Sequence, residues 1–132
     1  MSTRVFVYGA LRKGASNGWR MARANFVGEA TVLGTLVKVD WYPGLVLRGD
    51  TKVKGEVYDV DAQALRELDE FEGLGSEDTR NDEYKRVMTK VELEAGECLE
   101  CEVYEWQLGV ADYEMVENGD WLTVDVGTAR RV

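Results

Sequence analysis

The sequence contains no histidine, a single proline and only two cysteines. Without histidine the chain lacks the commonest general base, a frequent zinc ligand and the base of any Ser-His or Cys-His pair. No apolar run approaches the ~20 residues that cross a bilayer as a helix, and the first residues do not form a signal peptide. These absences exclude histidine-dependent hydrolases and predict a cytoplasmic protein with no membrane partner.

The two cysteines form a C-x-x-C pair, Cys98 and Cys101, which would suit a redox dithiol or half of a zinc site. No second pair and no histidine are present to complete a tetrahedral zinc site. The neighbouring residues favour a β-strand, on which a separation of three places the two side chains on opposite faces. We therefore predict structural cysteines, no metal site and no cofactor.

Length and charge restrict the possible functions further. A chain of 132 residues is expected to form a single domain, 1–132, and its 45% apolar content suffices for a core. The net charge of -9 argues against a nucleic-acid backbone as the main partner. It leaves open an acidic protein that mimics a nucleic acid, an interpretation that only the charge supports.

β-branched and aromatic residues predict a chain made mainly of strands, with two helical segments. The predicted strands are residues 3–8, a long or bent strand or hairpin over 26–39, two strands within 41–60 joined by a hairpin turn at 48–51, and an antiparallel pair at 83–93 and 98–106. The predicted helices are a short one within 15–24, capped by Ser16 or Asn17, and a clear one over 61–73, with Asp61 as N-cap and Gly73 as its stop; an acidic loop, 73–82, follows. This mixture indicates an α+β domain whose sheet curls into a small barrel.

The clear helix contains one charged residue that breaks its pattern. At about 100° per residue, Glu72 falls on the apolar stripe that Leu65 and Leu68 form. The residues expected at the surface are Arg66, Glu67, Glu70 and, at the edge of the stripe, Asp69. Two interpretations stay open. Either the helix ends at Phe71 and Glu72 swings out to the surface, or Glu72 is a carboxylate in an apolar pocket, with a raised pKa that suits proton transfer.

Five short motifs together resemble one known family. They are VFVYGALRKG (5–14), VKGEVYDVD (53–61), LDEFEG (68–73), EYKR (83–86) and NGDW (118–121). In order and approximate spacing they resemble the gamma-glutamylcyclotransferase-like family, most closely its small single-domain branch that acts on gamma-glutamyl amines. The resemblance implies an α+β fold, a small mixed, mostly antiparallel β-barrel flanked by short helices.

The resemblance also implies a reaction that needs no protein nucleophile. The α-amino group of a small gamma-glutamyl amine or peptide attacks its own γ-carbonyl, which releases 5-oxoproline and a free amine. The family's catalytic glutamate matches Glu72, which would then act as general acid and base. The family's Tyr-Gly-x-Leu loop, here Tyr8, Gly9, Ala10 and Leu11, would cradle the glutamyl group with backbone N–H groups.

The remaining motif residues receive more ordinary assignments. Tyr84 matches the tyrosine of the family's Tyr-x-Arg motif and is expected to donate a hydrogen bond to Glu72 or to substrate. We assign Arg86 to a salt bridge with a nearby acid and Trp121 to the core or the barrel closure. Arg12 and Lys13 could attract an anionic substrate, but loop cations of this kind usually lie solvated at the surface, and we assign them there.

One departure from the family pattern keeps a second function open. Many relatives carry Thr or Ser where this chain has Ala10, so a side-chain hydroxyl bond to substrate would be lost while the backbone donor remains. The alternative is therefore a catalytically silent relative that binds a small metabolite or serves as a protein-interaction module.

Overall fold

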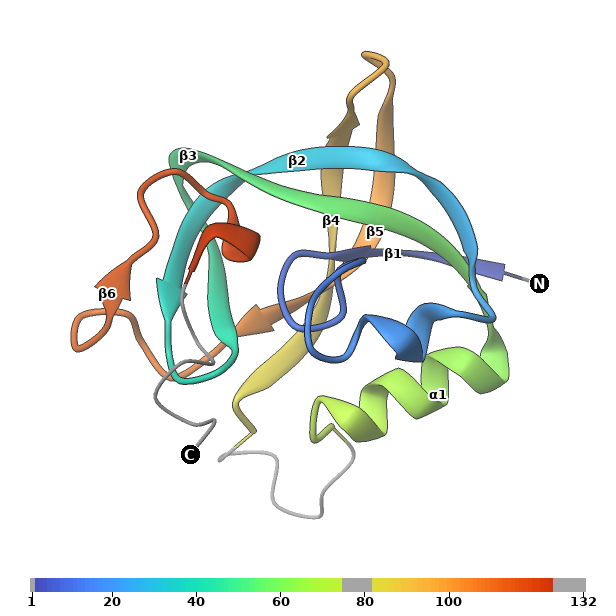
Figure 1. Ribbon diagram of the computed structural model, residues 1–132, viewed down its shortest axis with the longest axis horizontal. Helices are drawn as coiled ribbons and strands as arrows, with labels where there is room; N and C mark the ends of the chain where they lie inside the picture. Colours follow the sequence, from blue (N-terminus) through green and yellow to red (C-terminus); the bar gives the residue numbers. More distant parts are fainter. Residues whose placement is uncertain (1, 75–81, 125–132) are drawn as a thin grey trace.

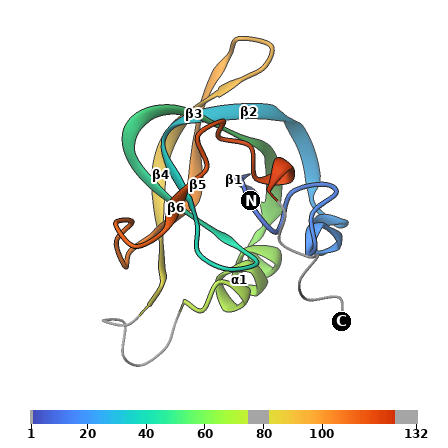
Figure 2. The same cartoon turned by 60° about the vertical axis from the view of Figure 1, so that its left-hand side comes forward.

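The computed structural model describes residues 2–74 and 82–124, so most of the predicted acidic loop, 75–81, lies outside the described residues. Five strands close into a mixed barrel in the order β3-β1-β5-β4-β2, with β3 also pairing with β2. Among the strands of residues 2–74 and 82–124, only the β1–β5 pairing is parallel. The predicted small, mostly antiparallel α+β barrel is therefore confirmed (Figures 1 and 2).

The elements have the following bounds. The strands are β1 (Ser2–Val7), β2 (Asn25–Lys38), β3 (Pro43–Asp61), β4 (Tyr84–Leu93), β5 (Cys98–Trp106) and β6 (Glu114–Met115), which adds to the end of β2. In the described part of the chain the helices are the α-helix α1 (Ala62–Phe71) and the 3₁₀ helices Gly18–Met21 and Trp121–Thr123. The short helix expected within 15–24 is thus a single 3₁₀ turn, in which Asn17 occupies the N-cap position without a side-chain capping bond.

Strand β1 separates two hydrophobic cores. Because successive side chains of a strand point to opposite faces, Phe6 and the adjoining Tyr8 pack inside the barrel, whereas Val5 and Val7 pack between the barrel and α1. Leu68 of α1 joins the outer core, and Trp121 joins the barrel core, as predicted. The chain that leaves β1 therefore emerges where the two cores meet, close to α1.

Strands β2 and β3 form one long, curved antiparallel ribbon within the barrel (Figure 1). The predicted hairpin turn at 48–51 is wrong: Gly34 pairs with Thr51 and Thr35 with Val46, so residues 47–50 bulge out of a single strand. Gly49 takes a φ of +120° there, and the Thr35 hydroxyl donates to the Arg48 carbonyl across 2.7 Å. The hairpin turn between the two strands lies earlier, at residues 39–42, where both Val39 N–H and Asp40 N–H donate to the Tyr42 carbonyl.

Helix α1 begins and ends as its sequence predicts. The Asp61 side chain accepts from Ala64 N–H at the first turn. At the other end, Gly73 N–H donates to the Glu70 carbonyl and Leu74 N–H to the Asp69 carbonyl, with Gly73 at a φ of +81°. This pair of bonds is the Schellman arrangement, which only a residue tolerant of positive φ completes without strain. The helix therefore stops at a defined residue, and Glu72 occupies its C-cap.

Strands β4 and β5 form the predicted antiparallel pair, and their connection projects beyond the barrel (Figures 1 and 2). Cys98 is exposed and Cys101 is buried, so the prediction of opposite faces is confirmed. Burial raises the pKa of the Cys101 thiol to about 11, which leaves it unreactive near neutral pH. No helix among the described residues is long and apolar enough to cross a membrane.

Candidate active site

One pocket of about 160 Å³ contains every site residue that the sequence predicted. Glu72, Tyr84 and the loop Tyr8–Leu11 all line it, although α1, β4 and the segment after β1 are far apart in the chain. The other lining residues are Phe6, Val7, Trp41, Tyr42, Pro43, Phe71, Glu83 and Tyr104. The pocket thus combines two carboxylates with walls that are mainly aromatic.

Glu72 reaches the pocket from the end of α1. The helix does end at Phe71, but the Glu72 side chain turns into the pocket instead of swinging out to the surface. No described residue donates a hydrogen bond to its carboxylate. Burial, and secondarily the charge of Glu83, raises the pKa of Glu72 to about 7. This carboxyl group can therefore both accept and donate a proton near neutral pH.

The loop after β1 forms a tight turn against the pocket. Arg12 N–H donates to the Gly9 carbonyl across 2.9 Å, which closes a four-residue turn, and Asn17 N–H donates to the Ala10 carbonyl across 2.8 Å. Within the described part of the chain, the N–H groups of Ala10 and Leu11 have no acceptor. Two adjacent free amides in a turn are suited to bind an anionic oxygen.

Gly9 is required by close packing and not by an unusual backbone angle. Its φ is not positive. A Cβ at this position would lie 2.5 Å from Cγ and 2.6 Å from Cδ of Pro43, whose ring is held by its own backbone. The absence of a side chain at Gly9 therefore lets the loop lie directly on Pro43, in the pocket wall.

The pocket tyrosines already have hydrogen-bond acceptors in the protein. Tyr8 donates to the Tyr104 carbonyl across 2.6 Å, and Tyr84 donates to the Pro43 carbonyl. Burial raises the pKa of both phenols, so they stay protonated at neutral pH. The predicted hydrogen bond from Tyr84 to Glu72 is not made, because the Tyr84 hydroxyl proton is directed to the backbone beside the loop.

Asp69 was expected at the helix surface, but in the structure its side chain binds two residues of neighbouring strands. Its carboxylate accepts a 2.7 Å hydrogen bond from the Tyr104 hydroxyl and lies 3.2 Å from Nε of Arg86. The prediction that Arg86 pairs with a local acid is confirmed, since Glu102 lies within 3.9 Å as well. These contacts fix the Tyr104 ring in the pocket wall.

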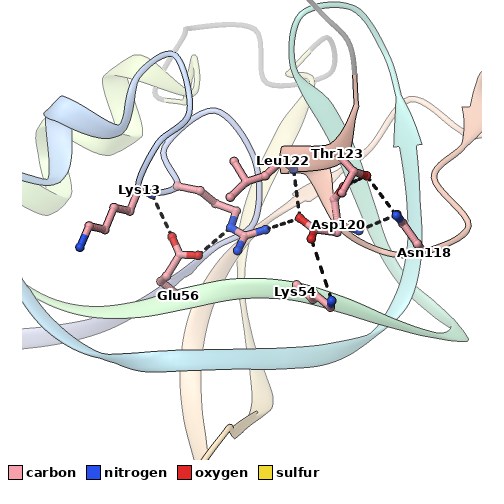
Figure 3. Close-up of polar contacts among 8 residues, drawn as sticks. Lys13, Lys54, Glu56, Asn118, Asp120, Leu122 and Thr123 are labelled. Atoms are coloured by element: carbon pink, nitrogen blue, oxygen red, sulfur yellow. Dashed lines mark hydrogen bonds and ion pairs between the residues drawn. The ribbon is translucent and has the colours of Figure 1, made fainter.

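Arg12 is a buried anchor, and its assignment to a solvated loop was wrong. Only 5% of it is exposed, and its Nε donates to Glu56 Oε2 across 2.6 Å while its Nη1 donates to Asp120 Oδ1 across 2.9 Å. The other Glu56 oxygen accepts from Lys13 N–H (Figure 3). Asp120 also caps the last 3₁₀ helix through Leu122 N–H (Figure 3). The end of the pocket loop is thereby tied to β3 and to the NGDW motif.

We expect Arg12→Met to lower the free energy of unfolding by ~3–5 kcal/mol, because it leaves the buried Glu56 carboxylate without its cation. Arg23→Met is the matched control, since its ion pair with Glu67 is exposed and should be worth at most ~1 kcal/mol. Urea denaturation measures both. Equal, small losses for the two variants would contradict a structural role for the Arg12 cluster, whereas an Arg12→Met, Glu56→Leu double variant should regain part of the loss.

Several lining residues were not predicted from the sequence. Trp41 and Tyr42 lie in the β2–β3 turn, whose position was misplaced, Pro43 is the first residue of β3, and Tyr104 lies on β5. Glu83 is the exception, because it stands directly before the Tyr84 that the motif identified. The position of this carboxylate next to a motif residue is the one sequence signal that would have predicted a further lining residue, Glu83.

Comparison with known proteins gives concordant results. The family model described as "Gamma-glutamyl cyclotransferase, AIG2-like" matches residues 5–123. The gamma-glutamylcyclotransferase family protein YtfP of Escherichia coli K12 is 34% identical over 123 residues, which are 92% of this chain and 98% of that protein. The gamma-L-glutamyl-butirosin B gamma-glutamyl cyclotransferase of Niallia circulans is 41% identical over 80 residues, 58% of this chain and 51% of that protein.

A solved structure shares the fold. The crystal structure of an AIG2-like protein from Mus musculus superposes with a TM-score of 0.69 at 28% identity, and the match covers 95% of this chain and 85% of that one. The family match extends over nearly all of the described residues, from β1 to the last 3₁₀ helix. The chain therefore belongs to the AIG2-like gamma-glutamyl cyclotransferase family of enzymes.

Proposed function

We propose that this protein is an intramolecular cyclotransferase that converts a gamma-glutamyl amine or peptide to 5-oxoproline and a free amine, with Glu72 as general acid and base. The observation that supports this most is the pairing of two features in one pocket. A carboxyl group with a pKa of about 7 and a turn with two amides that donate to no described residue line the same cavity. Proton transfer and anion binding are the two functions that the reaction requires of the protein.

The reaction proceeds by transfer within the substrate. Glu72 takes a proton from the α-ammonium group, and the resulting amine attacks the γ-carbonyl carbon to close a five-membered ring. The bond between this carbon and the leaving nitrogen then breaks. The α-nitrogen loses two protons in all and the leaving amine gains two, so Glu72 needs only to carry protons across the site. Holding the substrate folded supplies much of the rate, because nucleophile and carbonyl are already joined.

The raised pKa of Glu72 matches this proton transfer. An ordinary carboxylate, with a pKa of about 4.3, is a weak base for an ammonium group, and a pKa of about 7 narrows the difference in pKa between Glu72 and the substrate ammonium. Efficient general bases have pKa values near the working pH. The absence of a hydrogen-bond donor to Glu72 among the described residues leaves its oxygens available to the substrate ammonium.

The Ala10 and Leu11 amides would bind the negative oxygen of the substrate, either the α-carboxylate or the oxyanion that develops on the γ-carbonyl. Backbone donors held by the Arg12 cluster and by Pro43 are in place before reaction, so they cost little reorganisation. The lack of a hydroxyl at Ala10 does not remove these donors. We expect the chain to act without a cofactor, in the cytoplasm.

The proposal is tested by incubating the purified protein with a panel of gamma-glutamyl amines and peptides and measuring 5-oxoproline by mass spectrometry. We expect release of 5-oxoproline and amine in equal amounts from at least one compound. Tight binding of gamma-glutamyl compounds without any 5-oxoproline would support the catalytically silent alternative instead.

A further inference from the structure

The ring of Phe71 lies between two cavities. It lines the active-site pocket together with Glu72, which directly follows it in the chain. It also lines a groove between α1 and the 3₁₀ helix Gly18–Met21, to which Trp19 and Arg20 contribute. The Phe71 ring is therefore part of the barrier that separates Glu72 from the water in this groove.

The guanidinium group of Arg20 lies over that ring. Its Cζ atom is 4.3 Å from the centroid of the Phe71 ring and 4.5 Å from the centroid of the Trp19 ring. Its Nε donates to Asn17 Oδ1 across 3.1 Å, which orients the guanidinium plane. A flat guanidinium group stacks on aromatic faces, which the compact ammonium group of lysine cannot do. Arg20 thus connects the 3₁₀ helix to the last residue of α1.

The 3₁₀ helix is in turn bonded to the turn that follows β1. Asn17 N–H donates to the Ala10 carbonyl across 2.8 Å, and Arg20 N–H donates to the Asn17 carbonyl across 3.1 Å. A side chain on Gly18 would collide with the Arg12 carbonyl, so the first residue of the 3₁₀ helix lies directly on the loop. Through Arg20, the amide-bearing loop and the end of α1 are joined outside the pocket.

We propose, building on the cyclotransferase function above, that Arg20 is a positioning residue, which stacks on Phe71 and so holds the pocket wall closed beside Glu72 and keeps this carboxyl group in place relative to the loop. Arg20 does not line the active-site pocket, so it acts through Phe71 and not on the substrate. Its loss should therefore affect kcat more than KM.

A packing role and a purely electrostatic role of Arg20 would change the pKa of Glu72 in opposite directions. Burial is the main cause of the raised pKa, so a loosened Phe71 ring that admits water would lower it. Loss of a nearby positive charge would raise it instead. The titratable groups that face Glu72 come from the neighbouring strands and the segments next to them: Glu83, Tyr8, Tyr84 and Tyr104.

Arg20→Met removes the stacked group and keeps an apolar side chain. We expect kcat to fall on the order of 10-fold, less than a full 1 Å misplacement costs, with KM nearly unchanged. The pH midpoint of kcat/KM should move down from about 7 by on the order of one unit. Arg20→Lys, which keeps the charge without the flat group, should show most of the same shift. The melting temperature should change little, because an exposed cation–π contact contributes little to global stability.

Arg23→Met is the matched control. It removes the same charge three residues further along, from a side chain that pairs with Glu67 of α1 across 3.2 Å at the surface. This variant should keep the parent's kcat and pH midpoint. In a Phe71→Leu protein the stacking partner is already absent, so the further change Arg20→Met should have little additional effect.

An unchanged or higher pH midpoint in Arg20→Met would overturn the positioning role, and so would equal effects of Arg20→Met and Arg23→Met. The titration of Glu72 can also be followed without turnover, by NMR of its side-chain carboxyl carbon, assigned by comparison with Glu72→Gln. If the parent protein released no 5-oxoproline, the cyclotransferase proposal would be contradicted, while this titration would still decide whether Arg20 controls the environment of Glu72.

Discussion

Glu72→Gln should lower the rate of 5-oxoproline formation by ~10²–10⁴-fold, the usual cost of removing a general acid–base group. Glutamine fills the same space at the C-cap of α1 and can still form hydrogen bonds, but it cannot take the ammonium proton. For the parent protein, kcat/KM should rise with pH and level off above about pH 7, because Glu72 must be ionised to accept that proton. Initial rates of the two proteins between pH 5 and 9 measure both effects.

Glu72→Gln should also stabilise the fold at pH 8, and the raised pKa of Glu72 explains why the effect is a stabilisation. Burial raises the pKa of Glu72 to about 7, so the folded protein holds this proton more tightly than the unfolded chain. Protonated Glu72 therefore makes its full contribution to the stability of the fold at acid pH, and this contribution is lost as the pH rises to about 7 and the group ionises. Glu72→Gln, which is always neutral, should therefore melt at the same temperature as the parent at low pH and at a higher one at pH 8.

Glu70→Gln is the matched control for both measurements, since Glu70 is exposed on α1 and does not line the pocket. It should leave rate and melting temperature nearly unchanged. A well-folded Glu72→Gln protein with the parent's full activity would show that another group transfers the proton.

Gly9→Ala is expected to reduce activity on the order of 10²-fold, the loss that a misplacement of about 1 Å produces in a catalytic site. The added Cβ would approach Cγ and Cδ of Pro43 to 2.5 and 2.6 Å, so either the loop or the proline must move. Moving the loop displaces the Ala10 and Leu11 amides, and moving Pro43 displaces the acceptor of the Tyr84 hydroxyl. Gly9→Val should abolish activity for the same reason. Steady-state kinetics on variants that melt cooperatively provide the measurement.

Two further variants distinguish this explanation from a general intolerance of glycine substitution. Gly28→Ala should be tolerated, because its Cβ would meet nothing closer than Leu93 at 3.5 Å. In a Gly9→Ala, Pro43→Ala double variant the two clashing atoms are gone and the remaining Cβ lies 4.0 Å away, so activity should return in part. Normal turnover by a folded Gly9→Val protein would mean that substrate binds elsewhere.

Much of the fold was predictable because the sequence features that define each helix or strand lie within that element or next to it in the chain. The Asp61 cap, the Gly73 stop and the stripe through Leu68 define α1, and strong β-formers define β4 and β5. The turn predicted at 48–51 failed because a glycine next to an aspartate has the same local signature in a bulge as in a hairpin. Only the pairing of both halves of β3 with β2 decides between them, and this pairing is not local.

The site was predictable to a similar extent and for similar reasons. Helical periodicity put Glu72 in line with the apolar stripe but left open whether its side chain turns inward, and the motifs supplied the catalytic role of Glu72, the loop and Tyr84. The surface assignment of Arg12 failed because its partners, Glu56 and Asp120, are 44 and 108 residues away in the chain. A cation in a glycine-containing loop is usually solvated, and nothing near Arg12 in the sequence indicates that two acids meet it.

The most direct test of the proposed chemistry is the reaction run in water enriched in heavy oxygen. Cyclisation uses the substrate's own amine, so the product should be 5-oxoproline without heavy oxygen, formed in the same amount as the free amine. Water as the attacking group would instead give glutamate that carries one heavy oxygen atom. Labelled glutamate, or no product from any gamma-glutamyl amine, would contradict an intramolecular cyclotransferase at the Glu72 pocket.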